Sequence, residues 1–378
     1  MKWDDQQFMA AALGLAARGR GAVEPNPMVG AVIVRDGQVI GEGWHARFGG
    51  AHAEVEAITN ARGRGQDVAG ATMYVTLEPC SHTGKTPPCA EAVIEAKLAR
   101  VVIAMIDPFE RVAGSGVRRL REAGVTVEVG LCEREAHELN AAFVKRVTMG
   151  LPWVVLKWAQ TVDGRIATAT GDSQWISCEA SRRRVHEWRA RVDAVMVGAG
   201  TAVADDPQLT ARDVAVHRLA RPVVVDPNLR TPTTGRLATA SAKRLTLAVD
   251  EAVLAAGGEA VQQWQAKGTS LVGLPRLDGN EGMLDLRPLL RGLVEQHDAT
   301  NVLVEGGAGL AGALLSQGLV DQVLAFVAPK VAGDASALGA VRGWTLGRMA
   351  DALPLRLHDV ERIEEDVLLD YRVGEARG

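Results

Sequence analysis

The sequence predicts two α/β domains in one chain of 378 residues. The chain is longer than a typical single domain, and its hydrophobic content of 47% is enough for two cores. In both halves, short apolar runs alternate with helix-like patterns, as in folds built from β–α units. Gly150-Leu151-Pro152 interrupts this alternation. We therefore expect domains at residues 1–149 and 150–378.

The first domain is predicted to begin with a helix over Phe8–Ala17. Asp4 and Asp5 precede this apolar run, where a secretory signal would be basic. A hairpin should follow, with strands Val29–Arg35 and Gln38–Glu42 and the turn Asp36-Gly37. The elements expected next are helix 52–61, strand 72–77, helix 90–98, strand 101–105, helix 116–123, strand 125–129 and helix 133–148.

The second domain should contain a largely parallel sheet, because its strands alternate with helices. Ligands are then expected at the carboxyl ends of the strands. The predicted elements are strand 153–159, helix 179–189, strands 194–197, 223–226 and 245–249, helix 286–296, strand 301–304, helix 310–317 and strand 322–328.

The clearest chemical signal is the set His52, Cys80 and Cys89, with Glu54 beside the histidine. One imidazole and two thiolates supply three ligands to a tetrahedral zinc ion and leave one position open for water. Zinc lowers the pKa of that water to about 7, and Glu54 can carry its proton to a leaving amine. This pattern is typical of hydrolytic zinc deaminases.

His82 lies between the two cysteines and is a rival ligand. A fourth protein ligand would close the metal site and make it structural, so we assign His82 to substrate contact. Glu56 should face away from the metal on the same helix as Glu54.

The segment Pro79–Cys89 closely resembles the deaminase part of the bifunctional riboflavin-biosynthesis deaminase-reductases. Pro25–Val34 and Gly41–His45 are similar to the substrate-binding strands of that family, and the resemblance extends over nearly the whole chain. It implies a cytidine-deaminase-like three-layer domain followed by a dihydrofolate-reductase-like α/β domain. In the first domain it places Asn26, His45 and His82 against the substrate.

A glycine-rich turn, Glu305-Gly306-Gly307, follows a buried strand and precedes a helix. Its bare backbone amides can approach a phosphate at the helix N-terminus, although such turns often serve only tight packing. A second turn, Gly198–Thr201, lacks the third glycine of a dinucleotide-binding fingerprint, so we do not expect a Rossmann domain.

The family resemblance extends through the second domain in Lys157–Arg165, Ser173–Ile176 and Gly200–Arg212. It implies an NADPH site at Ala159, Trp175, Thr201, Asp205, Gly307, Ala308, Gly309, Leu310, Ala311, Gly312 and Ala313. It also implies contacts with a ribosyl phosphate substrate from Ser173, Arg189, Leu209, Arg212 and Glu305.

Some assignments in the second domain stay open. Lys157 and Asp205 are both candidates for the reductase proton donor. Trp175 either stacks on the nicotinamide or belongs to a core, and its neighbours Ser173 and Gln174 favour the site. The basic run Arg182-Arg183-Arg184 is better explained as a solvated helix face than as a ligand clamp.

Composition separates the possible functions. The net charge of −4 argues against a nucleic-acid binder. Four cysteines without a disulfide pattern indicate a reducing, cytoplasmic location, and no apolar run is long enough to span a membrane. A nucleic-acid deaminase with an accessory domain would show a basic groove and a short CxxC motif, and this chain has neither. If the zinc were structural, the chain would be a binding or regulatory protein, and metal removal would unfold the domain without any loss of activity to measure. The resemblance implies that a pyrimidine ribosyl phosphate is deaminated and then reduced by NADPH, in a homodimer or larger homo-oligomer.

Overall fold

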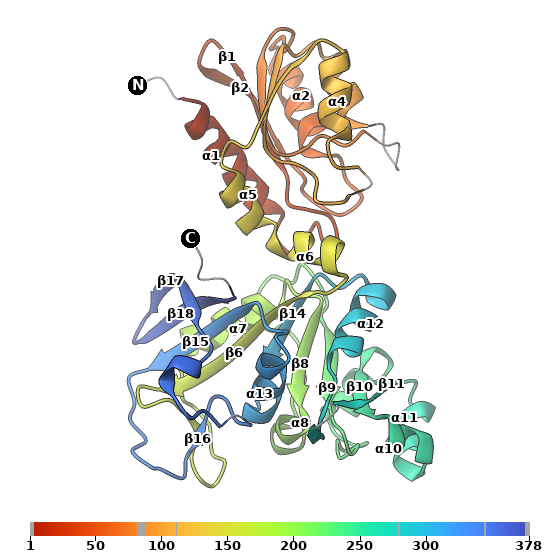
Figure 1. The fold of residues 1–378 in the computed structure, drawn as a ribbon, viewed down its shortest axis with the longest axis vertical. Coiled ribbons are helices and arrows are strands. Elements are labelled where there is room, and N and C mark those ends of the chain that lie inside the picture. Colours follow the sequence, from red (N-terminus) through yellow and green to blue (C-terminus); the bar gives the residue numbers. More distant parts are fainter. Residues whose placement is uncertain (1–3, 82–87, 111, 278–279, 344, 375–378) are drawn as a thin grey trace. The chain divides into compact units, whose positions relative to one another are not determined.

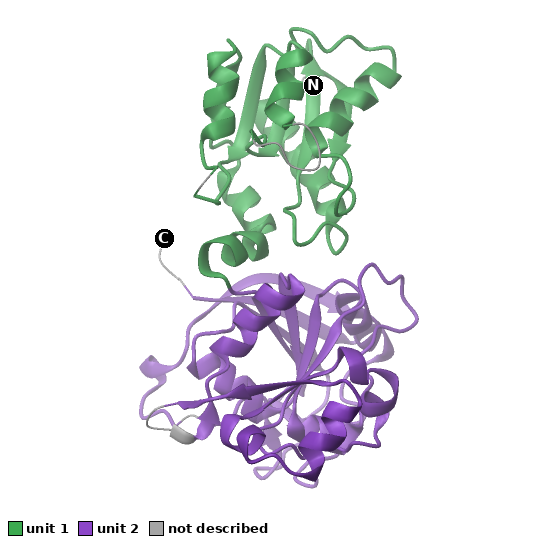
Figure 2. Ribbon diagram, turned by 90° about the vertical axis from the view of Figure 1, so that its right-hand side faces the viewer, with its two compact units in different colours: residues 1–150 green, residues 151–378 purple. Residues whose placement is uncertain are grey.

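The computed structural model describes residues 4–81, 88–110, 112–277, 280–343 and 345–374. The chain divides into two compact units, residues 1–150 and 151–378 (Figures 1 and 2). Both units are α/β, which confirms the predicted fold class. Among the described residues, no helix is long and apolar enough to cross a membrane.

The first unit is built on a five-stranded sheet in the order β2-β1-β3-β4-β5. The antiparallel hairpin turns at Asp36-Gly37, where both residues adopt positive φ angles, as the sequence predicts. β3, β4 and β5 run parallel. The strands are β1 (Gly30–Arg35), β2 (Gln38–Trp44), β3 (Thr72–Leu77), β4 (Arg100–Met105) and β5 (Thr126–Val129).

Helices cover both faces of this sheet, because its strands alternate apolar side chains between two cores. Ile33 faces the core formed with α2, α3 and α4, whereas Val32 faces the core formed with α1 and α5. The result is a three-layer unit. Its helices are α1 (Asp5–Ala16), the 3-10 turn η1 (Ala17–Gly19), α2 (Ala53–Gly63), α3 (Cys89–Glu95), α4 (Ser115–Glu122), α5 (Glu133–Leu139) and α6 (Ala141–Met149).

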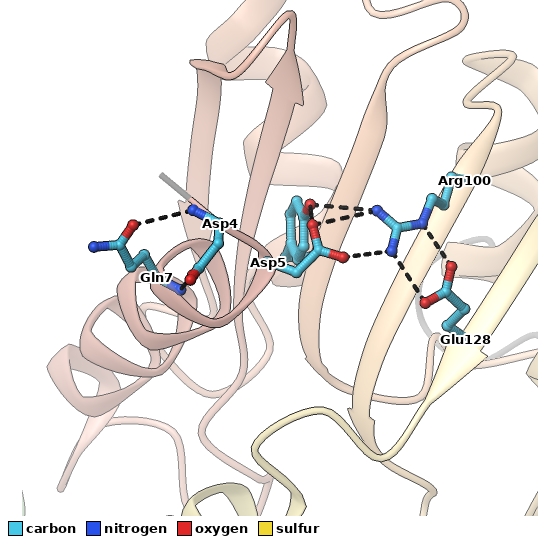
Figure 3. Close-up of polar contacts among 6 residues, drawn as sticks. Asp4, Asp5, Gln7, Arg100 and Glu128 are labelled. Carbon is cyan, nitrogen blue, oxygen red and sulfur yellow. Dashed lines mark hydrogen bonds and ion pairs between the residues drawn. The ribbon is translucent and has the colours of Figure 1, made fainter. Parts of the chain in front are cut away.

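The start of α1 is fixed to the sheet by a polar network (Figure 3). Asp4 and Gln7 form a reciprocal capping box at the helix N-terminus. Arg100 on β4 binds Asp5 at 2.5 Å and Glu128 at 2.8 Å. The hydroxyl of Tyr74 on β3 donates to Asp5 at 2.6 Å, and burial raises the pKa of Tyr74 to about 12. The helix expected over Phe8–Ala17 therefore begins earlier, at a well-capped aspartate.

The single helix predicted over residues 133–148 is wrong, because the structure divides it at Asn140 into α5 and α6. The Asn140 side chain accepts a hydrogen bond from the Met28 backbone N–H at 2.8 Å and donates to the Met28 carbonyl at 2.9 Å. This contact joins segments far apart in sequence and fixes Asn140 in a non-helical conformation.

The second unit contains a nine-stranded sheet in the order β11-β10-β9-β8-β14-β6-β15-β18-β17. Every pairing from β11 to β15 is parallel, as predicted, and the C-terminal hairpin β17–β18 adds two antiparallel strands. The sheet strands are β6 (Trp153–Thr161), β8 (Ala194–Gly198), β9 (Arg221–Val225), β10 (Thr246–Asp250), β11 (Ser270–Leu274), β14 (Asn301–Glu305), β15 (Gln322–Ala328), β17 (Leu355–Ile363) and β18 (Asp366–Val373).

Helices of this unit pack on both faces of the sheet and form two buried apolar clusters. Two short strand pairs lie outside the main sheet: β7 (Arg165–Ala167) with β16 (Leu338–Gly339), and β12 (Arg276–Leu277) with β13 (Asn280–Leu284). The helices are α7 (Glu179–Arg189), α8 (Ala199–Asp205), α9 (Arg236–Ala240), α10 (Glu251–Ala256), α11 (Glu259–Ala266), α12 (Arg287–His297) and α13 (Ala308–Ser316), with the 3-10 turns η2 (Ala242–Arg244) and η3 (Met349–Asp351).

Candidate active sites

The structure brings His52, Cys80 and Cys89 together, with their donor atoms within 4.8 Å of one another. His52 is the N-cap residue of α2, Cys80 follows β3, and Cys89 is the first residue of α3. The Nδ1 atom of His52 lies 3.1 Å from Sγ of Cys89 and 3.7 Å from Sγ of Cys80. The three ligand candidates therefore meet where two helices begin.

This donor set fits zinc. Tetrahedral bonds of about 2.3 Å to sulfur and 2.0 Å to nitrogen place neighbouring ligand atoms about 3.5–3.8 Å apart, close to the spacing found here. The Cys80 sulfur also accepts the Cys89 backbone N–H at 3.3 Å. Hydrogen bonds from Cys89 and His52 lower the pKa of the Cys80 thiol to about 4, which favours the thiolate that a metal requires. His52 at the start of α2 is thus already paired with this thiolate, and the pairing raises the pKa of His52.

Glu54 lies in the first turn of α2, next to the cluster, and its side chain is buried. Burial raises the pKa of Glu54 to about 7. A carboxyl group with such a pKa can both accept and release a proton near neutral pH. Glu56 lies on the exposed side of the helix, as expected.

Asn26 and His45 lie on one side of the cluster. The Nδ1 atom of His45 lies 2.9 Å from the Ala51 carbonyl oxygen, so it must carry the proton and donate. Its Nε2 atom then accepts from the Asn26 amide at 3.2 Å. The His45 and His52 rings meet edge to face at 5.4 Å. Of the expected substrate contacts, His45 therefore adjoins the metal ligand His52 and Asn26 binds His45, whereas the third, His82, lies outside the described residues.

Sequence reasoning missed Glu78, whose buried carboxylate precedes Pro79-Cys80. It accepts backbone hydrogen bonds at the N-terminus of α4 from Gly114, Gly116 and Val117, at 2.7–3.1 Å, and another from Asp107 at 3.2 Å. Because these donors lie 29 to 39 residues further along the chain, no local pattern identifies the role. The carboxylate fixes α4 against the segment that carries Cys80.

In the second unit, the glycine turn adjoins the start of α8. Gly306 and Gly307 adopt positive φ angles of 74° and 88°, which only glycine adopts at little cost. A Cβ atom on Gly306 would lie 3.3 Å from the Thr201 hydroxyl oxygen, so Thr201 of α8 lies against the glycine turn. Residues Gly307–Ala313 form the turn and the first two-thirds of α13, and the helix N-terminus is suited to an anion.

Glu305 ends β14 and forms a two-point ion pair with Arg189 of α7, at 2.6 and 2.8 Å. Both side chains are largely buried. Burial alone would raise the pKa of Glu305, but the charges of Arg189 and Lys157 hold it below its usual value. Lys157 lies opposite Glu305 in the β6–β14 register, and burial lowers its pKa. The structure thus joins three predicted residues in one charged cluster.

The other predicted reductase residues lie on loops and strand ends. Trp175 is 61% exposed and stacks under the Arg182 guanidinium at 4.6 Å, while its carbonyl accepts from Lys330 at 2.5 Å. Arg182 is therefore part of this site's surroundings and not only a solvated face. Ser173 lies just before Trp175, Ala159 lies on β6 and Asp205 ends α8, where burial raises its pKa. Leu209 and Arg212 lie on the loop after α8.

Both units match known families. Residues 1–105 match the cytidine and deoxycytidylate deaminase zinc-binding region, and residues 152–369 match the RibD C-terminal domain. The fold and sites therefore define an enzyme in which a zinc-dependent deaminase is joined to a reductase. The chain belongs to the RibD family, the bifunctional deaminase-reductases of riboflavin biosynthesis.

Similarity to individual relatives covers nearly the whole chain. It is 41% identical over 372 residues to the riboflavin biosynthesis protein RibD of Escherichia coli (strain K12), covering 97% of this chain and 98% of that protein. The RibD of Aquifex aeolicus (strain VF5) is 37% identical over 369 residues, with coverage of 97% and 98%. The structure of Acinetobacter baumannii RibD, form 1, superposes with a TM-score of 0.84 at 37% identity, covering 98% and 99% of the two chains.

Proposed function

We propose that this chain catalyses two successive steps on one pyrimidine. The first is hydrolytic deamination of 2,5-diamino-6-ribosylamino-4(3H)-pyrimidinone 5′-phosphate to 5-amino-6-ribosylaminouracil 5′-phosphate. The second is reduction of its ribosyl group to ribityl by NADPH. The observation that carries the proposal is the His52–Cys80–Cys89 cluster beside the buried Glu54, in a chain that also carries a reductase domain.

In the first step, His52, Cys80 and Cys89 would hold zinc, which when bound supplies the polarisation that activates water. Glu54 accepts a proton from the attacking water and delivers it to the departing amino nitrogen, which leaves as ammonia. Asn26 and His45 adjoin the ligands and are placed to bind the pyrimidine. Both ring nitrogens of His45 are engaged in hydrogen bonds, and its only N–H is donated to Ala51. The Asn26 amide is therefore the group of this pair that can turn its hydrogen bonds toward a ligand.

In the second step, NADPH when bound supplies the hydride that reduces C1′ of the sugar. Thr201 and the turn at Gly307 would hold its phosphates, with α13 supplying backbone N–H groups. Ala159, Trp175 and Asp205 are the remaining proposed cofactor contacts. Ser173, Leu209 and Arg212 are proposed to bind the ribosyl phosphate, together with the ion pair Arg189–Glu305.

Lys157 is favoured over Asp205 as the reductase proton donor. It faces Glu305 in the charged cluster, and its lowered pKa makes proton release easier near neutral pH.

We further propose a homodimer or larger homo-oligomer in the cytoplasm. β17 is an edge strand of the described sheet, with Leu357 50% and Val360 52% exposed, and such an edge is suited to pairing with a second copy. The cytoplasmic location is supported by the four free cysteines, because two of them, Cys80 and Cys89, are the proposed zinc ligands and must stay reduced. Light scattering of the wild type and of Leu357→Lys tests the assembly, since loss of the edge contact should lower the measured mass.

The test of the function is direct. Zinc-loaded protein is incubated with the diaminopyrimidine ribosyl phosphate and NADPH, and the products are identified by mass spectrometry. The proposal expects the deaminated ribityl phosphate. Glu54→Gln should retain zinc and abolish deamination, yet oxidise NADPH when given the deaminated compound. Retained deamination in this variant would exclude the role of Glu54, and unchanged substrate with the wild type would exclude the proposed substrate.

A further inference from the structure

We propose that His186 is a positioning residue of the reductase reaction, which holds the loop that presents Arg212 to the phosphate of the substrate. This inference rests on the function proposed above for the second unit. His186 lies on α7, three residues before Arg189, so the two side chains project from the same side of the helix.

The contact between His186 and the loop is specific. The Arg212 backbone N–H donates to Nδ1 of His186 at 3.2 Å. A backbone N–H can only donate, so this ring nitrogen must be unprotonated. One turn along α7, Arg189 donates from Nη1 to the Thr210 carbonyl at 3.2 Å. Two side chains of α7 therefore bind the loop backbone at residues two apart.

The loop requires such support because its backbone is in an unfavourable conformation. Leu209 has a φ angle of 55°, in the left-handed region that residues other than glycine, asparagine and aspartate rarely adopt. Its side chain is nevertheless only 1% exposed, packed in a buried cluster of the second unit. Neighbouring contacts must stabilise this conformation. Directly after Leu209, the Thr210 carbonyl accepts a hydrogen bond from Arg189 of α7, and the Arg212 N–H donates one to His186 of α7.

Arg212 is exposed, and its guanidinium group forms no ion pair within the described part of the chain. It is therefore available for an anion, and a guanidinium group binds a phosphate monoester through two parallel hydrogen bonds. Its neighbour Arg189 is already engaged by Glu305. The direction of the Arg212 side chain depends on its backbone, which His186 holds.

The charges around His186 favour the neutral ring that the contact needs. Burial lowers its pKa, and so do the nearby charges of Arg189 on α7 and Arg212 on the loop. Glu305 at the end of β14 and the Thr210 carbonyl act in the opposite direction, and Lys157 on β6 offsets part of the Glu305 charge. A protonated His186 would lose its acceptor and repel both arginines.

The experiment compares His186→Leu with His186→Asn, because an asparagine side chain can supply an acceptor in place of Nδ1 but does not titrate. His297→Asn on α12 is the matched control. Reductase kinetics are measured with the deaminated ribosyl phosphate, and deamination by the same chain reports on folding. His186→Leu should raise the KM for the ribosyl phosphate about tenfold, as expected for the loss of one hydrogen bond, with smaller changes in kcat and in the KM for NADPH. His186→Asn should restore most of the affinity.

The pH profile separates positioning from simple packing. As the pH falls below the ordinary histidine pKa of about 6.5, the KM of the wild type should rise more steeply than that of His186→Asn. Both proteins act on the same substrate, so the comparison cancels the effect of titrating the substrate phosphate. Wild-type protein without reductase activity would contradict the proposed function. An active wild type with an unchanged KM in His186→Leu, or equal pH profiles for wild type and His186→Asn, would overturn the role of His186 alone.

Discussion

The Glu78 carboxylate accepts a hydrogen bond of 2.7 Å from the backbone N–H of Gly116. A larger residue than glycine does not fit there, because a Cβ atom on Gly116 would lie 2.0 Å from the Pro79 carbonyl oxygen. This close approach brings the N-terminus of α4 directly onto the segment before Cys80. Ser81 and Ser115 add a second contact between the same segments, with their hydroxyl oxygens 2.7 Å apart.

Glu78→Gln should therefore destabilise the deaminase unit. The amide retains one acceptor oxygen but turns an NH₂ group toward backbone donors, which leaves buried N–H groups unpaired. We expect a loss of about 2–4 kcal/mol, in the range for charged hydrogen bonds and unpaired buried groups. Urea unfolding of the zinc-loaded protein measures this loss of stability. Glu122→Gln, at an exposed position on α4, is the control. Equal midpoints for the two variants would contradict this account.

Arg189→Met should destabilise the reductase unit, because Glu305 would keep a buried charge without its partner. Removing one member of such a pair costs about 3–5 kcal/mol, whereas replacing both costs much less. The double variant Arg189→Met/Glu305→Gln is therefore expected to recover part of the lost stability. Urea unfolding, monitored by tryptophan fluorescence, ranks the stability of the wild type, Arg189→Met and the double variant. A double variant less stable than Arg189→Met would show that the pair is not coupled in this way.

The sequence predicts the zinc cluster well because its signal is local. His52, Cys80 and Cys89 all lie at helix starts or strand ends, and their spacing alone suggests a metal site. Glu78 and His186 could not be found in this way, since each binds backbone groups more than 25 residues away. Their roles depend on how the chain folds back and not on a residue pattern.

The same limit applies to the fold. The buried strands β3, β8 and β14 are continuous apolar runs and were expected within one residue of their observed bounds. The hairpin β17–β18 was missed, because charged residues interrupt its sequence and most of β17 is exposed. The break at Asn140 was missed for a different reason, since the helical pattern continues on both sides and only the contact with Met28 interrupts it.

Cys80→Ser should remove zinc and deamination without affecting reduction. Serine is a poor zinc ligand, and two remaining ligands hold the ion weakly. We expect wild-type protein to contain one zinc per chain by elemental mass spectrometry and the variant to contain much less. Cys132→Ser is the matched control, because Cys132 lies outside the cluster. NADPH oxidation with the deaminated substrate should persist in both variants, and its loss in Cys80→Ser alone would mean that the metal also supports the second unit.

Asp163 should make the second unit sensitive to acid. Its carboxylate accepts hydrogen bonds from the Thr161 hydroxyl at 2.6 Å and from the backbone N–H groups of Ala332 and Gly333 at 3.0 and 2.8 Å. These bonds, that of Thr161 foremost, hold the pKa of Asp163 well below its usual range. A carboxyl group with a depressed pKa in the folded state stabilises the fold fully above its unfolded pKa, about 3.9. It loses that contribution as the pH falls toward the folded pKa.

Asp163→Asn should therefore unfold at lower urea concentration than the wild type at pH 6, and the two midpoints should converge between pH 4 and pH 2. A difference that stays constant over this range would show that the charge of Asp163 does not stabilise the turn.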